Sequence, residues 1–254
     1  MFTRRDLVRL LVPLMIEQIL AVLVGMADVV MVAVVGEAAV SGVSLVDSIS
    51  ILVIQMLAAL ATGGSVVCAQ YIGRKDEEKA CQAAGQLLLV TTLVSATVTA
   101  AALGGNRYLL RLIFGRVEPV VMENAVTYFF LSALSYPFLA VYNSCAALYR
   151  AMGNSKISMY ASFAMNILNI IGNAVCILGL HMGVEGVGIP TLLSRAFAAI
   201  LMLILIQQPK NVVRIQDLRS LRFEKHMVRS ILNVGIPNGM ENTMFQFGKL
   251  FLQS

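Results

Sequence analysis

Residues 10–35, LLVPLMIEQILAVLVGMADVVMVAVV, decide the fold of this chain. Within this stretch only Glu17 and Asp28 are charged. A helix needs about 20 mostly apolar residues to cross a bilayer, so the stretch predicts a transmembrane helix. It is too long for the apolar region of a signal peptide, although Arg4, Arg5 and Arg9 precede it.

The rest of the chain has the same character. Of its 254 residues, 58% are hydrophobic and 13% are charged, whereas soluble domains carry about 25% charged residues. The sequence is therefore expected to form an all-α integral membrane protein. Further helices are predicted near residues 43–72, 80–104, 123–149, 156–180 and 186–208, and a seventh is predicted to begin near residue 229.

The basic residues predict the orientation in the membrane. If the spans alternate in direction, fourteen of the 19 Lys and Arg residues fall on the side of the N-terminus and three on the other side. The positive-inside rule then places the N-terminus in the cytoplasm of a multi-pass protein, here expected in the plasma membrane. The same loops account for the net charge of +5, so no nucleic-acid partner is expected.

A short repeat indicates a two-lobed architecture. Pro13 and Glu17 recur as Pro237 and Glu241, 224 residues later and again near a helix start. Duplicated halves are common in secondary transporters, so we expect a protein of about 450 residues with twelve helices, of which this chain is a fragment. Chance similarity of two apolar helices is the alternative. The expected parts are a six-helix N-terminal lobe (1–208), a cytoplasmic linker (209–228) and the start of a C-terminal lobe (229–254).

Two carboxylates in the first span share one face. Glu17 and Asp28 are eleven residues apart, which is about 20° beyond three full helical turns. Charged groups at membrane depth cost at least about 2.5–3.5 kcal/mol and often mark ion or substrate paths. Both are therefore candidates for ion coupling, although each could instead only accept hydrogen bonds in a packed bundle.

Three asparagines line one face of the fifth predicted span: Asn166, Asn169 and Asn173. Asn173 and Asp28 lie at similar depth, about 26 Å from the N-terminal side of the membrane. Carboxylate and amide oxygens at one depth predict a site for Na⁺ formed by Asp28, Asn169 and Asn173, or for a proton on Asp28. The alternative is that the asparagines join helices by interhelical hydrogen bonds.

Other polar residues within the spans have a weaker pattern. Arg195 and Asp47 are at similar depth and are interpreted as a structural ion pair. Pro137 is expected to kink its helix, and Tyr136 and Tyr142 beside it are candidates for the wall of a substrate cavity, or for ordinary packing.

With these residues in place, the chain resembles the N-terminal half of the multidrug and toxic compound extrusion (MATE) transporters. The resemblance runs through nearly the whole chain. It is carried by the P-x-x-x-E and G-x-x-D patterns of residues 13–28, AQYIGRKD (69–76), LYRAMGNSK (148–156), N-x-x-x-N (169–173) and GIP (235–237).

The resemblance implies a twelve-helix antiporter that exports small organic cations in exchange for Na⁺ or H⁺, with no other cofactor. In that family an aspartate of the first helix and an asparagine-plus-acid pair of the fifth bind the coupling ion. Asp28 and Asn169 match this pattern, but Asn173 stands where many members have an aspartate. Glu241 is the one matching acid of the C-terminal lobe within this chain, and it joins the expected substrate cavity.

Three other functions remain open. A flippase for lipid-linked sugars would favour a basic cavity, whereas acids outnumber bases within the spans. A membrane enzyme is not expected, because the spans hold neither G-x-S-x-G nor H-E-x-x-H. An inactive half-transporter or a membrane scaffold would not need deep carboxylates on one stripe.

Overall fold

The computed structural model describes residues 4–115, 117–215 and 223–253, and the side chains of residues 4–10 and most of those after 241 are not described. Residues 216–222 of the expected linker, which include Arg219 and Arg222, lie outside the described residues, as does Arg116. The described elements are α1 (Arg4–Val35), α2 (Glu37–Gly73), α3 (Glu77–Phe114), α4 (Pro119–Ala151), α5 (Ser155–Ala174), η1 (Val175–Gly179), α6 (Glu185–Ile206) and α7 (Lys225–Gln253).

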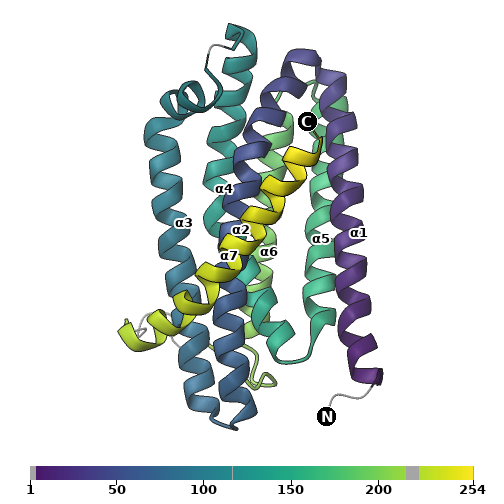
Figure 1. Cartoon of the computed structure of the whole chain (residues 1–254). Coiled ribbons are helices and arrows are strands. Elements are labelled where there is room, and N and C mark those ends of the chain that lie inside the picture. The colour runs from purple at the N-terminus through teal and green to yellow at the C-terminus, as the bar shows by residue number, and fades with distance from the viewer. Residues whose placement is uncertain (1–3, 116, 216–222, 254) are drawn as a thin grey trace.

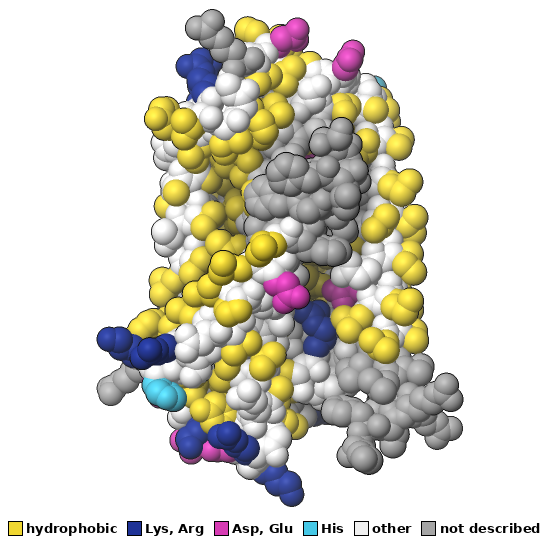
Figure 2. Space-filling view, viewed as in Figure 1, with side chains coloured by type: hydrophobic (Ala, Val, Ile, Leu, Met, Phe, Trp, Pro, Cys, Tyr) yellow, Lys and Arg dark blue, Asp and Glu magenta, His cyan; other side chains and the backbone are white. Residues whose placement is uncertain are grey.

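Six helices of the described part, α1 to α6, are long and apolar enough to cross a membrane. On the face shown in Figure 2, most Lys, Arg, Asp and Glu side chains gather at the two ends of the molecule, and hydrophobic side chains dominate between them. The all-helical membrane fold predicted from the sequence is therefore confirmed.

The central element of the bundle is α4, which packs against α2, α3, α5 and α6. At the edge, α1 lies mainly along α5 and touches α2 less (Figure 1). Because α1 has few neighbours, large apolar side chains such as Val22 (63% exposed) and Met26 (63% exposed) face outward. Such exposure is typical of a surface that lipid or another protein covers.

Helix α7 crosses α2 obliquely, as Figure 1 shows. The crossing depends on Gly63, where an added Cβ would lie 2.6 Å from the backbone nitrogen of Gly235. Small residues allow this close approach of two backbones, as in many membrane helix pairs. The second expected lobe therefore begins with a helix that packs tightly on the first.

Several helix boundaries differ from the sequence prediction, and two of them have a clear physical reason. We expected a helix end near residue 104, but α3 continues to Phe114. The Asn106 side chain donates to the Val126 carbonyl of α4 at 3.0 Å, and Leu110 is 1% exposed, so packing outweighs the low helix propensity of Gly104 and Gly105.

At the other boundary, α2 begins at Glu37 rather than near residue 43. Gly36 alone forms the turn from α1 to α2, with a φ of 137° that other residues rarely adopt.

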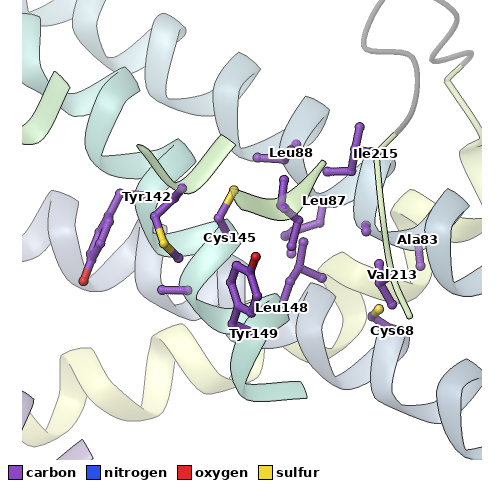
Figure 3. Close-up of a cluster of buried hydrophobic side chains, with 14 of the residues drawn as sticks. Cys68, Ala83, Leu87, Leu88, Tyr142, Cys145, Leu148, Tyr149, Val213 and Ile215 are labelled. Atoms are coloured by element: carbon purple, nitrogen blue, oxygen red, sulfur yellow. The ribbon is translucent and has the colours of Figure 1, made fainter. Parts of the chain in front are cut away.

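The chain that follows α6 packs onto the bundle. Val213 and Ile215 are buried in the apolar cluster that Tyr149 and Leu148 form with α2 and α3 residues (Figure 3). Asn211 donates to the Tyr149 hydroxyl at 3.2 Å. The described start of the expected linker is thus fixed to the six-helix lobe.

Candidate functional site

A cavity of about 210 Å³ lies between α1, α2, α4, α5 and α6. Its wall combines apolar side chains with three charged side chains, two amides and several hydroxyls. The polar lining residues are Asp28, Ser44, Asp47, Tyr128, Asn166, Asn169, Thr191, Ser194 and Arg195.

The hydrogen bonds of Asp28 connect α1 to α5. The Asn173 side-chain amide donates to Asp28 Oδ1 at 2.7 Å, and it also lies 3.3 Å from Asn169 Oδ1. Asn169 in turn donates to the Thr191 hydroxyl on α6 at 3.0 Å. The structure therefore brings together the three residues that the sequence predicted for an ion site and adds Thr191.

Local helix geometry produces this arrangement. Asn169 and Asn173 are one turn apart, so they share one face of α5, and both are buried. Directly after them the helix widens into a π-helical turn, Val175–Gly179, a feature frequent at functional sites. The sequence signal for Thr191 was weak, because one threonine within an apolar span is ordinary.

The oxygen atoms of this group suit a small cation. Asn173 Oδ1 is buried and has no hydrogen-bond partner among the described residues. Carboxylate, amide and hydroxyl oxygens are ligands of hard monovalent and divalent cations. Asp28 supplies the one negative charge among Asp28, Asn169, Asn173 and Thr191, which fits a singly charged ion or a proton.

The expected ion pair between Arg195 and Asp47 is wrong. Arg195 Nη1 donates to the Ser135 hydroxyl at 2.7 Å, and Asp47 Oδ1 accepts from the Tyr128 hydroxyl at 3.3 Å. Asp76 and Lys79 form an ion pair at 3.3 Å, whereas Asp47 and Arg195 form none with each other. Asp47 and Arg195 each have a neutral partner instead, because α4 supplies a hydroxyl group to each of them.

This correction adds Asp47 and Arg195 to the candidate site. Both line the cavity that Asp28 lines. Two carboxylates and one guanidinium give it a formal charge of −1 when both acids are ionised. The sequence showed these charges within the membrane, but it could not show that they share a cavity.

Glu17 lies apart from this cavity. The Tyr142 hydroxyl on α4 donates to Glu17 Oε1 at 3.4 Å, and neither residue lines the cavity. The shared stripe of Glu17 and Asp28 is real, but the two carboxylates occupy separate environments along α1.

The residues expected to form one substrate cavity do not come together. Tyr136 is fully buried and shares a hydrogen bond of 3.0 Å with Ser50. Pro137 lies within α4, which continues through it, and Glu241 is exposed on α7. Packing accounts for Tyr136, and none of the four lines the cavity.

Three comparisons relate the chain to known proteins. The family model MatE matches residues 13–175. The chain is 29% identical over 248 residues to the "Uncharacterized transporter YisQ" of Bacillus subtilis, covering 94% of this chain and 53% of that relative. It is 27% identical to the "Probable multidrug resistance protein NorM" of Thermotoga maritima, with 97% and 53% covered.

Among solved structures, an outward-facing multidrug resistance MATE family transporter of the MOP superfamily superposes with a TM-score of 0.89 at 25% identity. The superposition covers 97% of this chain and 54% of that transporter. The chain thus spans about half the length of the relatives it matches.

Proposed function

Because this chain belongs to the MatE family, we propose that it acts as the N-terminal lobe of a secondary antiporter that exports organic cations in exchange for Na⁺ or H⁺. The observation that carries the proposal is that Asp28, which lines a cavity between five helices, accepts a hydrogen bond of 2.7 Å from the buried amide of Asn173. A carboxylate at this depth needs a functional reason, because its desolvation is costly.

The proposed mechanism is alternating access. A coupling ion changes the balance between two lobe arrangements only if it binds one of them better. Asp28 is placed for this role, because its hydrogen-bond partner Asn173 lies on α5 and its own helix lies at the edge of the bundle. Movement of α1 against α5 would change the oxygens around the carboxylate, and with them the affinity for the ion.

The charge of the cavity supports coupling to one positive charge per cycle in this lobe. With Asn173 in place of an acid, Asp28 and Asp47 are opposed by Arg195 alone. A single Na⁺ or H⁺ brings the formal charge to zero, which removes most of the electrostatic penalty of closing the cavity.

The partner of this lobe is proposed to be a second, C-terminal lobe, in the same chain or another. We place the assembled protein in the plasma membrane with the N-terminus in the cytoplasm, on the basis of the basic loops. Its substrates are proposed to be small organic cations, in line with the multidrug names of relatives such as NorM.

The test is gradient-driven efflux of a fluorescent organic cation by the complete native polypeptide in proteoliposomes. Asp28→Asn should abolish efflux driven by a Na⁺ or H⁺ gradient while the protein remains folded, since the amide oxygen still accepts from Asn173. Asp76→Asn is the matched control, because this partly exposed helix cap lies outside the cavity. Normal coupled efflux by Asp28→Asn would reject the proposal.

A further inference from the structure

Glu17 and Tyr142 form a second polar site in the membrane, away from the Asp28 cavity. Glu17 lies on α1 and Tyr142 on α4, with 3.4 Å between the Tyr142 hydroxyl and Glu17 Oε1. Tyr142 is 4% exposed, so this contact lies inside the bundle. Along α1 the site is about 16 Å from Asp28, towards the end of the bundle at which α1 begins.

One oxygen of this carboxylate lacks a donor. Glu17 Oε2 is buried and has no hydrogen-bond partner among the described residues. A buried carboxylate oxygen without a partner is costly, since it loses its hydration without replacement. A purely structural carboxylate would be expected to have both oxygens satisfied, so this geometry calls for a bound positive charge.

Polar side chains connect the site with the Asp28 cavity. Ser162 on α5 lies close to the Tyr142 hydroxyl, and the Asn166 side chain lies 3.4 Å from the Ser162 hydroxyl. Asn166 also lines the Asp28 cavity. The seam between α1 and α5 therefore carries oxygen ligands from Glu17 to the cavity.

We propose that Glu17 and Tyr142 form a transit site for the coupling cation, Na⁺ or H⁺, between the Asp28 cavity and the membrane side where α1 begins. This inference rests on the proposed antiport function and adds a route to it. Glu17 supplies the charge, and Tyr142 holds one carboxylate oxygen so that the other stays free for the ion.

The first test separates transit from binding. Glu17→Gln keeps the size of the side chain and its acceptor for Tyr142 but removes the charge. We expect gradient-driven efflux to slow at least ten-fold, while equilibrium binding of the fluorescent cation stays within two-fold of the unmodified protein. Glu37→Gln is the matched control, because Glu37 is exposed at the start of α2.

Tyr142→Phe gives a second variant in case Glu17→Gln does not fold. It removes only the hydroxyl and should slow efflux several-fold. Efflux within two-fold of the Glu37→Gln control in a folded variant would overturn the transit site, and so would a loss of substrate binding that matches the loss of efflux.

A second test reads the two carboxylates separately. Dicyclohexylcarbodiimide, an apolar reagent for buried carboxyl groups, is added to the complete transporter, and mass spectrometry measures the labelling of each peptide. If Glu17 is a transit site, the reagent should label it. The extent of this labelling should change when a gradient of the coupling ion loads the site. Unreactive Glu17, or labelling independent of every ion condition, would overturn it. Normal efflux by Asp28→Asn would reject the antiport proposal itself, whatever Glu17 does.

Discussion

Replacing Asn173 with aspartate should add one positive charge to the coupling reaction. In the structure the Asn173 amide nitrogen is 2.7 Å from Asp28 Oδ1. Asn173→Asp would place a second carboxylate oxygen at about the same distance. Two unit charges about 3 Å apart repel by about 5–6 kcal/mol at an effective dielectric constant of 20, so the two groups cannot both stay ionised without a cation.

The pair must therefore bind one additional cation, either Na⁺ or a proton that the two carboxylates share. If Asn173 belongs to the ion site, this cation is bound and released with the coupling ion in each cycle. The measurement is the ratio of ions to substrate, read from the substrate gradient that a known ion gradient sustains in proteoliposomes. We expect one more positive charge per substrate in Asn173→Asp than in the parent.

Asn154→Asp is the control, since this substitution makes the same chemical change in the exposed turn before α5. An unchanged ratio in a folded Asn173→Asp protein would refute the assignment of Asn173 to the ion site.

Three further predictions test other parts of the account. Arg195→Gln removes the positive charge of the cavity. Across a 210 Å³ space, about 7 Å wide, this charge repels a bound cation by about 2 kcal/mol, so equilibrium titration should show cation binding about 30-fold tighter. Unchanged affinity would contradict the charge count. Gly63→Ala should lower the thermal unfolding temperature in detergent, because its Cβ would lie 2.6 Å from the α7 backbone. The control is Gly73→Ala, whose Cβ meets nothing within 4 Å, and equal effects of the two variants would argue against the tight crossing of α2 and α7. The hydrogen bond from the Lys79 backbone N–H holds the pKa of Asp76 below its usual 3.8. Asp76→Ala should therefore be less stable than the unmodified protein above pH 4, and this difference in stability should vanish as the pH falls further. A difference that persists in acid would exclude a charged cap at Asp76.

Most of the candidate ion site was predicted from helical periodicity. The spacing of Asn169 and Asn173 selects one face of their helix, and Asp28 lies at a similar depth on another span. These two observations single out the three residues in the sequence, but their contact also requires that α1 and α5 be neighbours, which the structure shows.

Contacts between helices could not be found in this way. The sequence paired Arg195 with Asp47 because opposite charges at one depth attract, but it did not reveal that Ser135 and Tyr128 on α4 provide a neutral partner for each. Likewise, Gly104 and Gly105 suggested a helix end, and only the contact of Asn106 with α4 shows why α3 continues. Such choices depend on which helices are neighbours, which periodicity does not specify.

Direct measurement of cation binding tests the central claim, that Asp28 holds the coupling ion. The complete transporter is purified, the binding of ²²Na⁺ is measured at equilibrium, and proton uptake is followed in the same preparation with an indicator dye. The account predicts that Asp28→Asn removes one bound Na⁺ or one proton per transporter, while Asp76→Asn removes none at neutral pH. If Asp28→Asn binds as many cations and protons as the unmodified protein, the ion site is elsewhere and the account is contradicted.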